Sequence, residues 1–240
     1  MSGTHHIVLV HSPLTTSDVW GDLAAHLCDR GCTVTVTEVR DDDPPYASRF
    51  VAHVAQQLQL AAPDDHVVLI GHGAAGPLLP QIGFARQAVG RPVRGYVFVD
   101  ALLPRTVGPS SLMDLIAASD PERAEGLTTR LAKNGMFPPV DDTELADAIP
   151  DPDVRAALLA DLRPRGLDFF TETLPSPVDW PDAPCGFVQL SDTFATEAHT
   201  AAQRGWTVSS VEAHHFWAVS DPDGLARALG DVLASWDDGG

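Results

Sequence analysis

The chain has 240 residues, of which 44% are hydrophobic, and its 15 basic and 33 acidic residues give a formal net charge of −18. This length and composition predict one α/β domain with a sizeable core and argue against disorder. The negative charge argues against nucleic acid and membrane partners, because both bind through cationic surfaces. No apolar stretch approaches the ~20 residues that span a bilayer.

The three cysteines have neither metal-binding nor redox spacing, and the N-terminus lacks a basic signal segment. These features predict a cytoplasmic protein without a metal, and they leave its oligomeric state open.

Short apolar runs alternate with amphipathic segments along most of the chain. The expected strands, nearly continuous in apolar or β-branched residues, are His6–Val10, Thr33–Val39, His66–Ile70, Tyr96–Val99, Cys185–Leu190 and Thr207–Val211. The expected helices are Ser17–Arg30, Tyr46–Leu60, Ala74–Ala88, Thr193–Arg204 and Pro222–Trp236. Asp221 is expected to cap the last helix, with Pro222 at its first position. This alternation predicts a doubly wound, mostly parallel sheet.

Residues 104–184 break the alternation. They contain no strand candidate, and short helical pieces are expected at Leu112–Ala118, Glu122–Lys133, Asp142–Ala148 and Val154–Leu162. About 80 residues is far longer than a usual connection between strands. We interpret this segment as a helical lid inserted into a core of residues 1–103 and 185–240; the alternative is a series of ordinary connecting helices.

The segment Gly71–Gly76, GHGAAG, allows two interpretations. As G-x-G-x-x-G after a strand, it is the spacing that binds a dinucleotide pyrophosphate, and Asp100 would be the ribose-binding acid. Two strand-helix units precede the segment, however, and Pro80 limits the free N–H groups that a phosphate needs. We therefore expect no cofactor. The second interpretation is a nucleophile elbow, G-x-S-x-G, in which Gly73 stands where the serine would be.

Four segments follow one another in the order that the second interpretation requires. They are Val8–Pro13 with Trp20, His72 before the turn at Gly73, Asp192 after a strand, and His215-Phe216 followed by Pro222. Together they resemble the α/β-hydrolase superfamily along essentially the whole chain, nearest to its small esterase and hydroxynitrile-lyase-like branch. The resemblance implies the α/β-hydrolase fold with a lid.

The resemblance also implies the catalytic pair. His215 would be the general base, with Asp192 as its acid partner and Asp100 as the alternative acid. Gly73 has no side chain, so no acyl-enzyme can form there.

The region that would bind the substrate or its oxyanion surrounds these residues. Ala74 supplies a backbone N–H, whereas Pro13 has none, and Leu14 is the substitute donor. Ser12 stands at the family's glycine position. His72 and Trp217 are neighbouring candidates. Further apolar candidates for a pocket are Leu102, Leu103, Met113, Met136, Phe137, Phe169, Phe170 and Trp180.

These observations leave three functions open. The first is an enzyme that uses a His-Asp dyad for non-covalent acid-base chemistry as a lyase, cyclase, isomerase or water-mediated hydrolase. Its substrate would be a mostly apolar small molecule, with natural-product metabolism as a setting. The second is an inactive ligand-binding protein, and the third is a hydrolase with an unconventional nucleophile such as Ser12.

Overall fold

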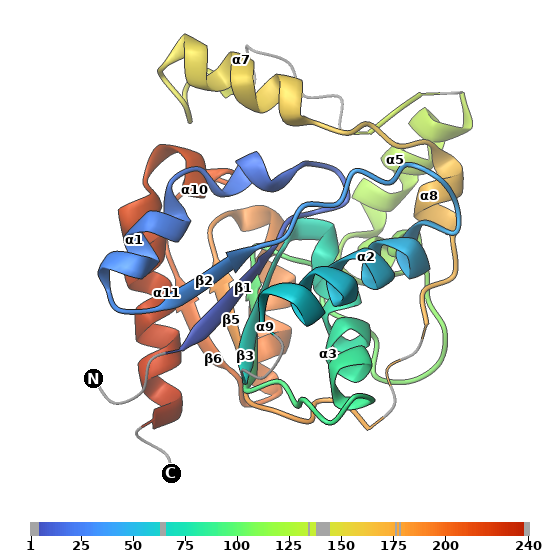
Figure 1. Cartoon of the computed structure of the whole chain (residues 1–240). Helices are drawn as coiled ribbons and strands as arrows, with labels where there is room; N and C mark the ends of the chain where they lie inside the picture. Colours follow the sequence, from blue (N-terminus) through green and yellow to red (C-terminus); the bar gives the residue numbers. More distant parts are fainter. Residues whose placement is uncertain are drawn as a thin grey trace.

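The computed structural model describes residues 5–62, 66–133, 135–137, 145–175, 177 and 179–237. In these residues a six-stranded parallel sheet has the strand order β2-β1-β3-β4-β5-β6 (Figure 1). The strands are β1 (His6–Val10), β2 (Thr33–Val36), β3 (Val67–His72), β4 (Gly95–Val99), β5 (Cys185–Gln189) and β6 (Thr207–Ser210). The predicted parallel sheet is confirmed. Two boundaries differ from expectation by more than one residue: β2 stops three residues early, and β3 continues through Gly71 and His72.

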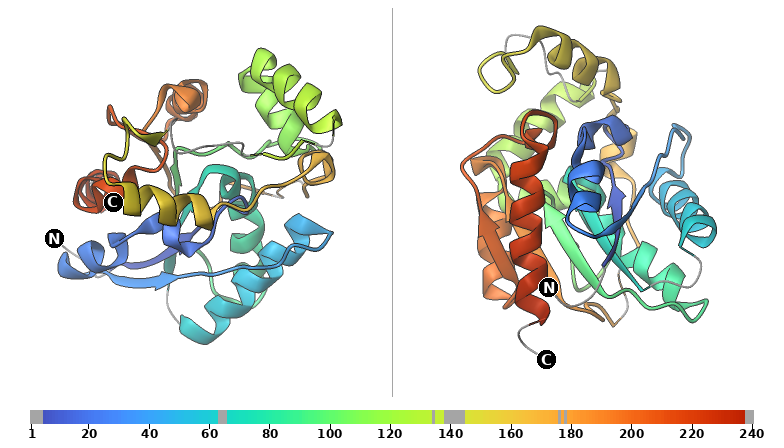
Figure 2. Two further views of the ribbon diagram at one scale, coloured as in Figure 1. Left: turned by 90° about the horizontal axis from the view of Figure 1, so that it is seen from above. Right: turned by 60° about the vertical axis from the view of Figure 1, so that its left-hand side comes forward.

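Helices cover both faces of the sheet (Figure 2). The longer ones are α1 (Leu23–Asp29), α2 (Tyr46–Ala61), α3 (Leu79–Gln87), α9 (Ala195–Gln203) and α11 (Pro222–Asp237), and a short α10 covers Trp217–Ser220. Side chains alternate along each strand, so Ile7 and Leu9 share a core with α1 and α11, whereas Val8 and Val10 share one with α2, α3 and α9. Two buried cores therefore hold the sheet rigidly between helical layers.

Three predicted helices are each split into a 3-10 segment and an α-helix. Ser17–Arg30 becomes η1 (Ser17–Trp20) and α1, because Gly21 has a φ of +48° and lies against Ala218. Ala74–Ala88 becomes η2 (Gly73–Leu78) and α3, since its two prolines remove backbone donors. Thr193–Arg204 becomes η3 (Asp192–Phe194) and α9. The Asp221 cap is confirmed, because Asp221 Oδ1 accepts the N–H of Gly224 at 2.8 Å.

Residues 104–184 connect β4 to β5, which pair directly. Their described part holds the helices α4 (Leu112–Ser119), α5 (Pro121–Ala132), α7 (Pro152–Asp161) and α8 (Leu167–Thr171), and no strand. In Figure 1, α5, α7 and α8 lie along the upper and right-hand sides of the molecule. Three of the four predicted pieces correspond to α4, α5 and α7. The fourth, Asp142–Ala148, lies partly outside the described residues, and α8 was not predicted.

Candidate active site

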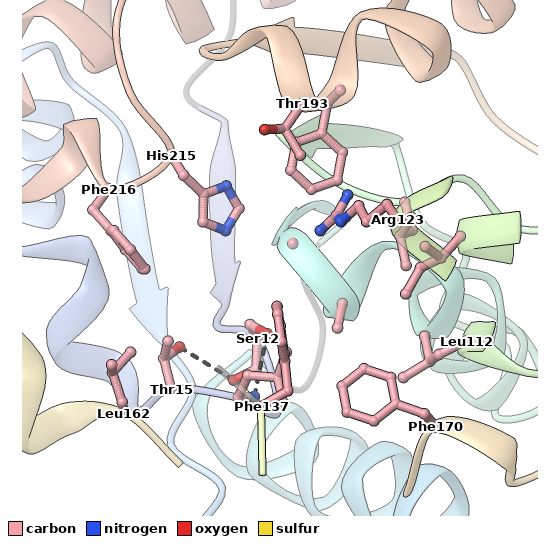
Figure 3. A pocket seen from close by; sticks show the side chains of 16 residues that line it. Ser12, Thr15, Leu112, Arg123, Phe137, Leu162, Phe170, Thr193, His215 and Phe216 are labelled. Atoms are coloured by element: carbon pink, nitrogen blue, oxygen red, sulfur yellow. Dashed lines mark hydrogen bonds between the residues drawn. The ribbon is translucent and has the colours of Figure 1, made fainter. Parts of the chain in front are cut away.

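A cavity of about 250 Å³ lies at the carboxyl ends of the strands, between the sheet and residues from the 104–184 segment (Figure 3). This edge is where open parallel sheets bind their ligands. The lining is mostly apolar and aromatic; it consists of Ser12, Leu14, Thr15, Gly73, Ala74, Leu102, Leu112, Ile116, Arg123, Phe137, Leu162, Phe170, Thr193, Phe194, His215 and Phe216. The cavity is therefore suited to a small, largely apolar molecule.

His215 lines this cavity and is paired with Asp100. Its Nδ1 donates to Asp100 Oδ2 at 2.8 Å, and Asp100 is completely buried. Because a carboxylate only accepts, this bond leaves the proton on Nδ1 and an unprotonated Nε2 on the neutral ring. The geometry therefore provides an oriented imidazole base.

Asp100 follows β4, and residues just after β5 fix its side chain. Its carboxylate accepts four hydrogen bonds, which come from His215, from both the N–H and the hydroxyl of Ser191, and from the N–H of Leu190. Burial alone would raise the pKa of Asp100, but these bonds hold it below its usual value. Asp100 thus remains an anion opposite the imidazole.

The expectation that Asp192 is the partner of His215 is wrong in this structure. Asp192 begins η3 and is exposed, while the alternative acid, Asp100, makes the bond. Both residues follow neighbouring strands. Asp100 is the one that faces His215, because its backbone turns with a φ of 43° at the end of β4.

His72 packs against His215 and is hydrogen-bonded to its backbone. Its Nε2–H donates to the backbone carbonyl of His215 at 2.9 Å, and the two ring centroids are 4.2 Å apart. His72 is absent from the cavity lining. Burial, followed by the nearby His215, lowers the pKa of His72 to about 3. His72 is therefore a neutral positioning residue.

Gly73 lies at the turn from β3 into η2, with a φ of +57°. A Cβ built on Gly73 would be 3.4 Å from His215 Nε2 and 3.6 Å from the Cβ of Ser12. The free nitrogen of His215 thus faces the space beside Gly73. Ala74 follows in the first turn of η2, where a backbone N–H has no partner within its own helix.

Residues 12–14, which were predicted to lie near the substrate or its oxyanion, belong to the loop after β1 and have different roles there. Ser12 Oγ accepts the N–H of Leu14 at 3.2 Å, so Leu14 is not a free oxyanion donor. Pro13 does not line the cavity, and its carbonyl accepts from the guanidinium of Arg165 at 3.4 Å. Because the Ser12 hydroxyl accepts from Leu14, its own proton is available to a ligand oxygen.

Sequence reasoning placed some pocket residues correctly and others not. Among the apolar candidates, Leu102, Phe137 and Phe170 line the cavity. Trp217 does not: it packs into the core beside α11, and its neighbour Phe216 takes the place in the lining. The lining residues that were not predicted are Thr15, Leu112, Ile116, Arg123, Leu162, Thr193, Phe194 and Phe216. Two of them bear on the chemistry: Arg123, which is charged, and Phe194, whose aromatic ring stacks on His215 with centroids 5.3 Å apart. No motif marks either residue.

The comparisons with known proteins identify the family and the fold of this chain. The sequence pattern of the alpha/beta hydrolase family matches residues 7–228, and the chain belongs to this family. In the comparison with curated proteins, no sequence matched.

Several solved structures have the same fold. An extracellular α/β-hydrolase from a Paenibacillus species has a TM-score of 0.74 at 16% identity, covering 95% of this chain and 98% of the other. Tomato methylketone synthase I complexed with 2-tridecanone has a TM-score of 0.69 at 16% identity, with coverages of 97% and 99%. Polyneuridine aldehyde esterase has a TM-score of 0.68 at 18% identity, with coverages of 96% and 100%. These similarities establish the fold.

In the part of the chain that the structure describes, no helix is long and apolar enough to cross a membrane. The same residues contain no group of three or more His, Cys, Asp or Glu side chains that could hold a metal ion. The cytoplasmic location stays a prediction, and the Paenibacillus protein is described as extracellular.

Proposed function

We propose that this protein is a non-covalent acid-base enzyme in which Gly73 occupies the nucleophile position and His215, oriented by Asp100, moves a proton of the substrate itself. The observation that carries the proposal is the pairing of His215 Nδ1 with a buried carboxylate, while Nε2 faces the space beside Gly73. An imidazole in this arrangement is a general base near neutral pH.

A covalent route has no support from the described residues. Gly73 has no side chain, and Ser12 Oγ is hydrogen-bonded to the N–H of Leu14, with no hydrogen bond to His215. A serine nucleophile needs a base within hydrogen-bonding distance. The hydroxyl of Ser12 is better placed as a donor to a substrate oxygen.

The reaction follows from these positions. A carbonyl oxygen of the substrate accepts hydrogen bonds from the Ala74 N–H and the Ser12 hydroxyl, and His215 Nε2 takes a proton from the adjacent carbon. The electron pair of the broken C–H bond moves into the carbonyl, giving an enolate, and Asp100 stabilises the imidazolium that forms. In an isomerisation the proton then returns from His215 to the same or another carbon. In an elimination the electron pair of the enolate forms a C=C double bond, the leaving group departs with its bonding pair, and His215 gives the proton to that group. Isomerisation and elimination share the formation of the enolate.

The substrate class is a small, mostly apolar carbonyl compound. The lining supplies few polar groups, and the ligand named for the similar tomato enzyme, 2-tridecanone, is a ketone with an apolar chain. The 104–184 segment supports a lid role, because it contributes Leu112, Ile116, Arg123, Phe137, Leu162 and Phe170 to the cavity. A lid that closes over the cavity excludes water from the enolate.

Proton abstraction can be measured without knowing the natural substrate. We expect the native protein to accelerate exchange of the α-hydrogens of 2-octanone in D₂O, followed by proton NMR, at least tenfold over buffer. His215→Gln should remove the acceleration. His199→Gln, at an exposed position on α9, is the matched control and should keep it.

An exchange rate equal to that of buffer, with 2-octanone bound to the folded native protein, would overturn the enzyme proposal in favour of a ligand-binding protein. Acceleration that survives His215→Gln would overturn the assigned base.

A further inference from the structure

Arg123 is the one arginine or lysine among the described residues that line the cavity. It lies in the first turn of α5, and its guanidinium carbon is 5.7 Å from the centre of the Phe194 ring. Figure 3 shows Arg123 and His215 extending toward the cavity from opposite sides. A permanent positive charge therefore faces a mostly apolar space.

The guanidinium of Arg123 makes no hydrogen bond or ion pair with any described residue, and its Nη1 is buried. A buried donor without a partner costs free energy, more so when it is charged. This cost is removed when a ligand supplies the acceptor.

Glu197 is the carboxylate whose charge interacts with Arg123, but the two side chains form no ion pair. Glu197 is itself buried, its Oε2 has no hydrogen-bond partner, and burial raises its pKa. Burial thus works against the charged form of Glu197, so this residue does not neutralise Arg123 within the cavity.

We propose that Arg123 is a binding site for a carboxylate of the substrate, so that the cavity takes a small apolar carboxylic acid. A planar guanidinium binds a carboxylate through two parallel hydrogen bonds, and the apolar surroundings strengthen the interaction. The inference rests on the proposed function for the reacting end of the molecule, whereas the binding end rests on Arg123 alone.

The position of Arg123 also determines which group reacts. Phe194 lies against both His215 and Arg123, so one ligand can reach both side chains, with its carboxylate at Arg123 and its reacting carbon at His215. Arg123 stabilises the carboxylate as an anion. This carboxylate is therefore retained, and the proton transfer at His215 takes place elsewhere in the chain of the acid.

Binding of octanoate and of octanamide tests the inference, because the two probes have the same size and differ in charge. A cavity of about 250 Å³ has the volume of about eight liquid waters at ~30 Å³ each, which suits a molecule of this length. By calorimetry, octanoate should bind the native protein ten- to a hundredfold more tightly than octanamide. Arg123→Met should abolish the preference, and Arg123→Lys should retain part of it.

Two controls separate the carboxylate site from other effects. Arg130→Met changes an exposed arginine on the same helix and should leave the preference intact. Glu197→Gln should leave octanoate binding as tight or tighter. Equal affinity for the two probes, no binding of octanoate, or a preference that survives Arg123→Met would each overturn the inference.

His215→Gln distinguishes this inference from the proposed function. It should stop α-hydrogen exchange, while the preference for octanoate over octanamide, which depends on Arg123, remains. If octanoate binding fails but exchange still depends on His215, only the carboxylate site is wrong. If octanoate binds through Arg123 and no exchange occurs, only the proton-transfer function is wrong.

Discussion

The imidazole of His215 hydrogen-bonds to Asp100 at 2.8 Å, although the chain order of the two residues is equally compatible with Asp192 as the acid. Asp100 directly follows β4, one of the two central strands of the sheet, and four hydrogen bonds fix its carboxylate. Because the His215–Asp100 pair is fixed in this way, a serine introduced at residue 73 can test its geometry.

Gly73→Ser should create esterase activity on short p-nitrophenyl esters, because the new Oγ would lie beside the free Nε2 of His215. Adding His215→Ala should abolish this activity. Adding Asp100→Asn should reduce kcat by a factor on the order of 10³–10⁴, as expected when a catalytic histidine loses its orienting carboxylate.

Asp192→Asn in the Gly73→Ser background is the matched control and should retain full esterase activity, since Asp192 is exposed and does not bond to His215. A loss in this variant equal to that caused by Asp100→Asn would contradict the dyad.

A fluorophosphonate probe should leave the native chain unlabelled and should label residue 73 in the Gly73→Ser variant. The reason is that Ser12 Oγ is engaged by the N–H of Leu14 and not by a base. Mass mapping of the labelled peptide provides the measurement. Labelling of Ser12 in the native chain would instead favour the third function, a hydrolase in which Ser12 is the nucleophile.

Gly76→Ala should destabilise the fold by about 1–3 kcal/mol, because an added Cβ would collide with the backbone carbonyl of Leu102. The control is Gly126→Ala in α5, where no atom lies within 4 Å of an added Cβ and helix propensity predicts stabilisation of about 0.5–1 kcal/mol. Urea unfolding of both variants measures the two effects. Equal stabilities would mean that η2 does not pack against the end of β4 as closely as described.

His72 should make the native fold less stable as pH falls. Its pKa is about 3 in the folded protein and 6.5 for the ordinary side chain, so below pH 6.5 the unfolded chain binds a proton that the folded chain does not. The free energy of unfolding contributed by this residue therefore decreases from pH 6.5 toward pH 3. A glutamine at residue 72 binds no proton in either state. In urea titrations between pH 7.5 and 5, the free energy of unfolding of His72→Gln should therefore decrease less steeply than that of the native protein. Parallel slopes for the two proteins would contradict a buried neutral His72.

Much of the fold could be predicted because each strand and helix has its own local signal. The β1 run of apolar residues and the Asp221-Pro222 helix start are patterns that neighbouring residues determine. The split helices were missed at Gly21 and at Pro80 for a different reason. A helical pattern of apolar residues continues across these positions, while a positive φ at Gly21 and the missing N–H at Pro80 interrupt the helical hydrogen bonds.

The sequence by itself determined the alternating α/β order and the glycine at residue 73, and it predicted His215 as the candidate base, because each of these signals lies in a short stretch of chain. The tertiary structure decided that Asp100 is its partner and that Arg123 and Phe194 face the same cavity as His215. These residues are separated by tens of positions along the chain, and only the pairing of β4 with β5 and the packing of α5 bring their side chains together.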